Sequence, residues 1–422
     1  MNDDRLTNWA GNLTYGAARV HRPETVEEVR EIARKSERVR GLGARHSFNG
    51  VADTTGDLIS LERMERVVGL DVERRTVTVE GGIKYGTLAR ALHEAGWAVA
   101  NTASLPHITV AGACATATHG SGDKNGCLAT SVVGLELVSG DGSVVAFSRE
   151  RDGERFNGVV VGLGALGIVT RLTLDIVPTF QVAQTVCEGL SFERLERDFE
   201  GVMSAGYSVS LFTDWMGDAI SQVWLKQRVG DAGTGELGEG FFGAARATVK
   251  RHPITILPAD NCTEQLGVPG PWHERLPHFK LEHTPSSGAE LQSEYFVERR
   301  HVVGALRAVR GLREEMAPVL QISEIRTVAA DDLWMSPYRG RDTVAFHFTW
   351  LPDWPGVSEL LPKLEAALAP FNARPHWGKL FTMVPERVRE LYPRMGEFRA
   401  LAKELDRDGK FRNRLVETYV LG

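Results

Sequence analysis

The spacing of hydrophobic residues predicts helices and strands in mixed order over the first part of the chain. Apolar positions three and four apart are typical of amphipathic helices, whereas alternating or short continuous apolar runs are typical of strands. Helical spacing occurs at residues 26–33 and 85–95, and strand-like runs occur at residues 58–61, 76–80 and 172–177. Two apolar runs within residues 132–148 meet at Asp141-Gly142, which predicts a β-hairpin. This mixture indicates an α+β unit rather than regular β–α alternation.

Beyond Pro178 the pattern predicts a second α+β unit, so we place a domain boundary near residue 178. Helical spacing occurs at residues 192–205, 297–316 and 358–368, alternating with strand-like runs at 222–225 and 344–349. Residues 229–259 are rich in Gly and Ala, and we expect a loop-bearing insertion there. Residues 405–413 are turn-like and too few for a domain, so we expect this tail to pack back on another part of the chain.

Composition narrows the class of protein. The length of 422 residues fits two or three domains, and 42% hydrophobic with 25% charged residues is typical of a globular protein. A net charge of −6 gives no support for binding to nucleic acid or to an anionic membrane. Four widely spaced cysteines form no CxxC pair, which argues against a zinc site or a disulfide framework. The N-terminus is unlike a signal peptide, and the most apolar run, residues 159–169, is too short to cross a bilayer. We therefore expect a cytoplasmic protein without nucleic-acid or membrane partners.

Residues 39–49, VRGLGARHSFN, place His46 inside a glycine-rich loop after a short strand-like run. Gly41 and Gly43 permit backbone conformations that residues with a Cβ avoid. Successive N–H groups can then converge on a diphosphate. The loop on its own is equally compatible with an ordinary strand-to-loop turn that carries a surface histidine.

Residues 101–122, NTASLPHITVAGACATATHGSG, form the richest neutral polar stretch and include His107 and His119. Small residues let a ligand approach the backbone, while hydroxyl and amide groups supply neutral hydrogen bonds. The stretch suits a large, partly apolar cofactor that carries phosphates and an imide-like edge. A packing loop of small residues is the alternative interpretation.

The sequence argues against several common binding and catalytic motifs. Residues 162–167 fit GxGxxG, but a strand-like run follows them where a dinucleotide-binding fingerprint requires a helix. His273, His278 and His283 recur every five residues, which matches no standard zinc spacing. There is no G-x-S-x-G elbow and no P-loop.

A second set of polar residues lies in the C-terminal half. Glu324 and Arg326 alternate along a strand-like run, as do His347 and Thr349, so each pair is expected to face one side. The segment 375–379, PHWGK, adds His376 and Lys379. Each residue alone is ordinary, but together they suit the orientation of a hydroxylated substrate and the stabilisation of developing alkoxide character.

Ordered blocks along nearly the whole chain resemble the vanillyl-alcohol-oxidase-type flavoproteins, and within them the alditol (sugar-alcohol) oxidase branch is the most similar. The blocks are TNWAGN (7–12), GARHSFN (43–49), ASLPHITVAG (103–112), SVSLFTDW (208–215), NCTEQLGVPGPWHERLPHF (261–279), EIRTVAAD (324–331) and RPHWGK (374–379). The resemblance implies an α+β fold of two domains. Residues 1–178, completed by residues 376–422, would form an FAD-binding domain, and residues 179–375 a substrate-binding cap domain.

The resemblance also implies roles for individual residues. His46 matches the histidine that is bonded covalently to the flavin of FAD. The family's other cofactor contacts fall on Gly41, Leu42, Gly43, Ala44, Arg45, Ser47, Ser104, Thr109, Gly112, Thr116, Ala117, Thr118, His119, Ile168, Val169 and His376. Its substrate contacts fall on Ser104, Glu324, Arg326, Thr349 and Lys379. No metal is implied.

From these matches we infer a division of labour among the catalytic residues. Lys379 and Arg326 would polarise the reacting C1 hydroxyl. Glu324 and Thr349 would bind the next hydroxyls, and Glu324 would also hold Arg326. His347 is the candidate proton acceptor, and Ala103 is expected to influence access of O2. Arg45 departs from the Gly or Ser-Gly common before the family histidine.

The implied reaction is the oxidation of the terminal C1 hydroxyl of alditols such as xylitol and sorbitol to the aldose. The hydride would pass to flavin N5, and O2 would accept the electrons to give H2O2. We expect a monomer whose partners are a small polyol and O2. A sugar-1,4-lactone oxidase of the same superfamily is the alternative, since those proteins share similar loop, EIR-like and HWGK-like segments. A flavin carrier without turnover is disfavoured by the complete Glu324, Arg326 and Lys379 set.

Overall fold

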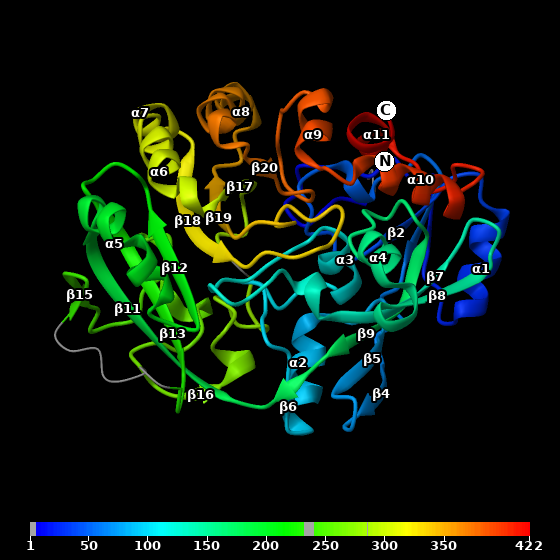
Figure 1. Cartoon of the computed structure of the whole chain (residues 1–422), viewed down its shortest axis with the longest axis horizontal. Coiled ribbons are helices and arrows are strands. Elements are labelled where there is room, and N and C mark those ends of the chain that lie inside the picture. The colour runs from blue at the N-terminus through cyan, green and yellow to red at the C-terminus, as the bar shows by residue number, and fades with distance from the viewer. Residues whose placement is uncertain (1–5, 232–239, 285) are drawn as a thin grey trace, which may run out of the picture.

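The computed structural model describes residues 6–231, 240–284 and 286–422. Figure 1 shows two neighbouring parts, with small sheets on the right and one large sheet on the left. The strands of the small sheets come from residues 19–178, and those of the large sheet come from residues 181–375. Within the described ranges, no helix is long and apolar enough to cross a membrane. The expected mixture of helices and strands in an α+β fold is confirmed.

The first small sheet is parallel and carries the strand that leads into the glycine-rich loop. Its order is β1-β3-β2, with bounds Arg19–His21, Asp57–Ser60 and Val39–Leu42. Helix α1 (Val26–Lys35) begins where Oγ1 of Thr25 accepts a hydrogen bond from the N–H of Glu28. Its Val29 and Ala33 pack with residues of β2 and β3, as the helical spacing predicted.

The second small sheet is antiparallel and contains the predicted hairpin. Its order is β4-β5-β9-β7-β8, with bounds Val67–Asp71, Thr76–Glu80, Ile168–Asp175, Val132–Val138 and Val144–Ser148. Gly142, in the turn between β7 and β8, has a φ of +80°, a conformation that favours glycine. Helices α2 (Tyr85–Glu94), α3 (Val110–Ala115) and α4 (Arg149–Val159) accompany this sheet, and β6 (Trp97–Ala98) pairs with β10 (Val177–Pro178).

The large sheet is antiparallel and forms the second half of the molecule. Its order is β14-β15-β11-β13-β12-β18-β19-β17-β20, and β16 pairs with β11. The bounds are Gly240–Phe241, Ala244–Arg246, Gln181–Ser191, Ala219–Arg228, Ser208–Thr213, Leu320–Val328, Thr343–Trp350, Leu291–Glu298 and Arg374–Pro375, with Gly270–Pro271 for β16. Helices α5 (Phe192–Ser204), α6 (Val302–Arg310), α7 (Arg313–Met316) and α8 (Trp354–Leu368) accompany it, and α6 to α8 stand above the sheet in Figure 1.

The single helix predicted for residues 297–316 is wrong. Strand β17 continues through Val297 and Glu298, which pair with Val344 and Thr343 of β19. A 3-10 turn and the separate helices α6 and α7 follow. Pairing inside the large sheet therefore overrides the local helical spacing. Of the insertion expected at residues 229–259, residues 232–239 lie outside the described ranges, and β14 and β15 form part of the remainder.

The C-terminal segment returns to the first half of the molecule. This segment contains helices α9 (Pro385–Leu391), α10 (Met395–Leu405) and α11 (Arg414–Val416), and the turn-like tail joins α10 to α11. Phe411 of that tail is buried among residues of α1, β2 and β3, which confirms that the tail packs back. The guanidinium of Arg40 on β2 donates to the carbonyls of Phe411, Leu163 and Gly164. One buried arginine thus joins the tail and the glycine-rich 162–167 turn to the strand before the loop of His46.

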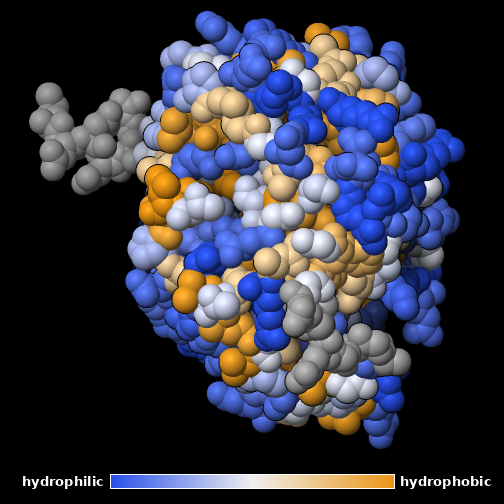
Figure 2. All heavy atoms as spheres, turned by 90° about the vertical axis from the view of Figure 1, so that its left-hand side faces the viewer, coloured by the Kyte–Doolittle hydropathy of each residue, from blue (hydrophilic) through white to orange (hydrophobic). Residues whose placement is uncertain are grey.

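The outer face of the large-sheet half is chemically mixed. Figure 2 shows hydrophobic residues there as small groups separated by hydrophilic ones. The exposed large hydrophobic residues are likewise spread widely along the sequence, at Met216, Val249, Ile256, Leu351 and Trp354 among others. The dense clusters of charge and aromatic rings described below lie inside the molecule.

Candidate active site

A cavity that is open to solvent is lined by residues of both halves of the molecule. The small-sheet half contributes the loop after β2, the segment 103–119 and helix α3. The large-sheet half contributes β17, β18 and β19, and the segment 376–379 closes the cavity. One cavity therefore joins a glycine-rich loop, which suits a phosphate-bearing cofactor, to a wall of charged side chains, which suits a small polar substrate.

The loop after β2 has the features of a diphosphate cradle. The backbone N–H groups of residues 44–47 donate to no acceptor among the described residues, so they are available to phosphate oxygens. A Cβ on Gly43 would lie 2.5 Å from Oγ1 of Thr109, and a Cβ on Gly112 would lie 2.8 Å from the same atom. Glycine at both positions lets the loop approach α3 closely. The residues present thus fit the phosphate-bearing cofactor that the sequence predicts.

His46 is held at the rim of this cradle. Arg45 before it has a φ of +64°, a strained conformation for a residue other than glycine. The indole of Trp9 stacks on the His46 ring, with the ring centroids 5.1 Å apart. Burial, together with His107 and Lys84 nearby, lowers the pKa of His46 to about 3. The imidazole is therefore neutral at physiological pH, as a nucleophile must be.

Hydrogen bonds tie the loop of His46 to the segment that carries Lys379. The side-chain amide of Asn49 donates to the carbonyls of Trp377 and Lys379, at 2.9 and 2.7 Å. The N–H of Phe48 donates to the carbonyl of Gly378 at 2.8 Å. The two segments are more than 300 residues apart in sequence, so these bonds fix the distance between cofactor loop and substrate wall.

Glu294 on β17 is the centre of charge in the opposite wall. Its side chain is 1% exposed. Its Oε1 accepts from Nη2 of Arg326 at 2.7 Å and from Nε2 of His119 at 3.0 Å, and Nζ of Lys379 lies 2.7 Å from Oε2. Burial alone would raise the pKa of Glu294, but Lys379, His119 and Arg326 hold it well below its usual range. The carboxylate therefore stays ionised and fixes two cations at the cavity.

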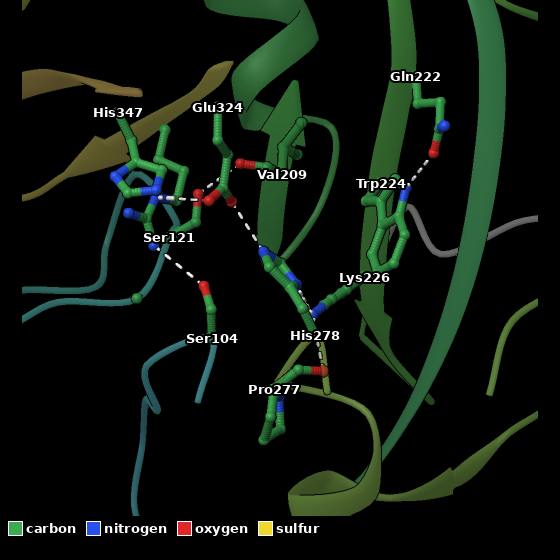
Figure 3. A network of polar contacts seen from close by, with 12 residues as sticks. Ser104, Ser121, Val209, Gln222, Trp224, Lys226, Pro277, His278, Glu324 and His347 are labelled. Atoms are coloured by element: carbon green, nitrogen blue, oxygen red, sulfur yellow. Dashed lines mark hydrogen bonds and ion pairs between the residues drawn. The ribbon is translucent and has the colours of Figure 1, made fainter. Parts of the chain in front are cut away.

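Glu324 on β18 is the second buried carboxylate of the wall. Nε2 of His278 donates to its Oε1 at 2.7 Å, while Nε of Arg326 lies 3.5 Å from its Oε2. Against the opposing effect of burial, Arg326 and His278 lower the pKa of Glu324 below its usual range. Arg326 also donates to Oγ of Ser104 at 3.2 Å. Figure 3 shows Glu324 between His347 on one side and His278 on the other.

Lys379, His347 and Thr349 form a short chain beside Glu294. Nζ of Lys379 donates to Nδ1 of His347 at 2.7 Å, and Nε2 of His347 lies 3.2 Å from Oγ1 of Thr349. Burial and the charge of Lys379 lower the pKa of His347 to about 4, so the ring is neutral near pH 7. Burial also lowers the pKa of Lys379, although Glu294 opposes this. A cationic or neutral amine thus lies one hydrogen bond from a neutral imidazole.

The cavity brings together nearly all residues that the sequence singled out. Every predicted catalytic and substrate-binding residue lines it, namely Ser104, Glu324, Arg326, His347, Thr349 and Lys379. So do His376, Ala103 and the predicted cofactor residues of the loop and of the 104–119 segment except Ala117. Ile168 and Val169 are not among the lining residues, whereas Leu163 and Gly164 of the preceding turn are. Glu324 pairs with Arg326 at 3.5 Å, in line with the expectation that it holds this guanidinium, and Glu294 adds a shorter contact of 2.7 Å.

The sequence analysis missed Glu294, His278 and Trp9. Glu294 lies inside the otherwise apolar strand LQSEYFVE, and a glutamate in such a strand is buried only when it is paired. The position of Glu294 in this strand therefore indicates a buried, paired carboxylate. It does not indicate that the partners are His119, Arg326 and Lys379. His278 was considered only as part of an unsuitable metal spacing. Its partner Glu324 is 46 residues away and meets it only in the fold.

Comparison with known proteins gives matches along the whole chain. The family model described as FAD binding domain matches residues 17–148, and the model described as D-arabinono-1,4-lactone oxidase matches residues 289–419. Alditol oxidase of a Streptomyces species (strain IKD472) is 52% identical over 421 residues, which cover 99% of both chains. L-gulono-1,4-lactone dehydrogenase of Mycobacterium tuberculosis is 28% identical over 96% of this chain and 97% of its own.

Solved structures of low sequence identity share the fold. Cholesterol oxidase from B. sterolicum superimposes with a TM-score of 0.79 at 15% identity, covering 99% of this chain and 96% of its own. A solvent-stable cholesterol oxidase gives a TM-score of 0.78 at 16% identity. At this identity the likeness concerns the arrangement of the elements alone.

Proposed function

This chain belongs to the alditol oxidase family of flavoproteins, and from that premise we propose that it oxidises alditols with FAD as its cofactor. The observation that carries the proposal is the convergence of two cations, two carboxylates and a hydroxyl on one wall of a cavity whose other wall is a phosphate cradle. The hydroxyl groups of a polyol can accept hydrogen bonds from the cations and donate them to the carboxylates. The N–H groups of the cradle can donate hydrogen bonds to a diphosphate.

The residues around the cradle would hold FAD. The N–H groups of residues 44–47 and the glycine contacts with α3 suit its diphosphate, and the neutral 104–119 segment suits its rings. We assign to His46 a covalent bond to the flavin, which the neutral imidazole and its fixed orientation against Trp9 support. When bound, FAD supplies the acceptor for the hydride that leaves C1, and O2 then takes the electrons to give H2O2.

The wall residues would bind and polarise the polyol. Lys379 and Arg326, both fixed by Glu294, would donate to the reacting C1 hydroxyl and stabilise negative charge on its oxygen. Glu324 would accept a hydrogen bond from a polyol hydroxyl beyond C1. Thr349 would form a hydrogen bond with another of these hydroxyls. Because these groups are buried and already positioned, they lose little orientational freedom when substrate binds.

The same geometry supports a path for the hydroxyl proton. Nζ of Lys379 would pass one of its protons to Nδ1 of His347, which lies 2.7 Å away, as it receives the proton of the C1 hydroxyl. The His347 ring is neutral near pH 7, so Nδ1 carries a lone pair that can receive it. We therefore assign the role of proton acceptor to His347, reached through Lys379.

The division of the chain follows from these roles. Residues 1–178 and 376–422 would form the FAD-binding domain, and residues 179–375 the substrate domain. The lining of the cavity by both parts supports this division. A cytoplasmic location, the monomeric state and control of O2 access by Ala103 stay predictions.

Oxygen consumption separates the proposal from the lactone alternative. We expect the purified holoenzyme to consume O2 and release an equal amount of H2O2 with xylitol or sorbitol, and far less with L-gulono-1,4-lactone. Preference for the lactone would instead favour oxidation of a sugar lactone, the substrate class named for the more distant relatives.

Acid precipitation tests the covalent bond. Yellow colour should remain in the washed protein pellet of the wild type and move to the supernatant for His46→Ala. Colour that stays with the His46→Ala pellet would remove His46 from its assigned role.

A further inference from the structure

Lys226, near the end of strand β13, is a buried lysine whose amine contacts no carboxylate directly. Its side chain is 0% exposed. Nζ donates to three acceptors, namely the carbonyl of Leu276 at 2.5 Å, the carbonyl of Pro277 at 3.3 Å and Nδ1 of His278 at 3.0 Å. An ammonium group has three N–H donors, so all of them are used. Burial lowers the pKa of Lys226 to about 7, and the charge of Glu324 opposes this shift.

This arrangement fixes the tautomer of His278. Since Nδ1 accepts from Lys226, the ring proton is on Nε2, which donates to Oε1 of Glu324 at 2.7 Å. Burial and Lys226 lower the pKa of His278 to about 4, so the ring remains neutral and keeps this donor–acceptor order. Figure 3 shows the resulting row from Lys226 through His278 to Glu324.

Aromatic packing and the backbone of His278 hold the row in place. The ring lies edge-on to Phe212 and Trp224, with centroids 5.6 and 5.2 Å apart. The backbone N–H of His278 donates to the carbonyl of Ser104 at 3.0 Å. His278 therefore contacts residues on two sides of the cavity, and its orientation fixes Glu324 relative to Ser104.

We propose that His278 and Lys226 are a buried positioning pair that orients Glu324 as a hydrogen-bond acceptor for substrate hydroxyls beyond the reacting carbon. The inference rests on the proposed function, because it takes Glu324 as a polyol contact. His278 turns one carboxylate oxygen away from the substrate and leaves Oε2 for Arg326 and the ligand. Without that bond, the carboxylate would be free to rotate toward Arg326, which is 3.5 Å away.

Two substitutions at His278 separate positioning from packing. Glutamine can accept from Lys226 through its amide oxygen and donate to Glu324 through its amide nitrogen, whereas leucine fills similar space and does neither. For His278→Leu we expect KM for xylitol to rise roughly tenfold or more, with kcat changed less than about threefold. For His278→Gln we expect KM within about threefold of the wild type. His283→Leu makes the same chemical change at an exposed residue of the same segment and should leave both constants unaltered.

Lys226→Met provides a second variant for the case in which His278→Leu does not fold. It removes the amine that donates to Nδ1 of His278 but leaves the ring, so we expect a rise in KM smaller than that of His278→Leu. Lys403→Met, on the exposed surface of α10, is its matched control. Flavin content of each variant reports whether the cofactor half is intact.

The outcomes are distinct. An unchanged KM in both His278→Leu and Lys226→Met, or a His278→Gln variant as impaired as His278→Leu, would overturn the positioning role while the proposed function stands. A wild-type protein that oxidises no polyol would overturn the proposed function itself, and the positioning role would fall with it.

Discussion

At the scale of single residues, Glu294 determines how the substrate wall is charged. One carboxylate contacts Lys379, Arg326 and His119, so it compensates both cations that face the cavity. Burying a cation without such a partner is costly, and an unpaired lysine would lose its proton instead. Glu294 thus fixes the two cations with which the wall would stabilise an alkoxide.

Removal of the Lys379 amine is the sharpest test of this wall. In Lys379→Met, the C1 hydroxyl loses a donor and the route to His347, and we expect kcat for xylitol to fall about 10²–10³-fold. Steady-state oxygen consumption measures the change. The flavin absorbance should remain, because Lys379 is bonded to Glu294 and His347 and not to the diphosphate cradle. A variant that keeps its flavin and loses less than about threefold in kcat would contradict the role of Lys379.

The sequence was a good guide to residues that occur in recognisable motifs. Glu324, Arg326, His347, Thr349 and Lys379 were all named in advance, and all line the cavity. The sequence did not point to Glu294, His278 or Lys226, because their role depends on hydrogen-bond partners that are 32 to 175 residues away. Burial and pairing of isolated charges arise from the fold, which local spacing does not encode.

At the scale of elements, the loop after β2 and helix α3 act as one unit. Gly43 of the loop and Thr109 before α3 are 66 residues apart in sequence. A Cβ added to Gly43, or to Gly112 of α3, would nevertheless lie within 3 Å of the threonine hydroxyl. Arg40 fixes the strand before the loop, and Asn49 fixes the chain after it. The loop is therefore held from both ends while its N–H groups stay free.

Gly43→Ala tests the need for this close approach. The new Cβ would lie 2.5 Å from Oγ1 of Thr109, so the threonine side chain or the loop must shift, and we expect the purified protein to contain less FAD. Gly69→Ala is the control, because a Cβ there meets no heavy atom within 4 Å. Combining Gly43→Ala with Thr109→Ala removes the clashing hydroxyl and should restore part of the flavin content. Full flavin content in Gly43→Ala alone would show that the loop is not constrained in this way.

Predictability at this scale depended on whether an element is stabilised locally. Helix α1 and the β7–β8 hairpin were predicted correctly, because capping by Thr25 and the turn at Gly142 are local signals. The prediction of one helix over residues 297–316 was wrong, because the first of these residues complete strand β17, which pairs with β19. The spacing of hydrophobic residues within a short segment does not show whether that segment pairs with a distant strand.

At the scale of the whole molecule, the buried histidines couple stability to pH. Burial lowers the pKa of His278 and of His347 to about 4, whereas an unfolded chain takes up a proton near 6.5. Between pH 6.5 and 4 the unfolded state therefore binds more protons, so stability falls as the pH falls. At pH 5 each of the two groups would cost about 2 kcal/mol relative to pH 7.5.

Thermal unfolding at matched ionic strength measures this effect. We expect a lower midpoint at pH 5 than at pH 7.5, and a further fall below pH 4.5, where the ionised Glu294 loses its advantage. An equal or higher midpoint at pH 5 would show that these histidines are charged in the folded protein.

The whole molecule also brings its two halves to a common task. Asn49 connects the cofactor loop to the segment of Lys379, and His278 connects the substrate wall to Ser104. Cofactor and polyol would thus be held by groups whose relative positions are fixed by hydrogen bonds across the cavity.

Reduction of the bound flavin without O2 tests the central claim most directly. Anaerobic addition of xylitol to the yellow holoenzyme should bleach the flavin absorbance, while L-gulono-1,4-lactone at the same concentration should leave most of it unchanged. Bleaching by the lactone with no response to xylitol or sorbitol would contradict the assignment of this protein as an oxidase of alditols.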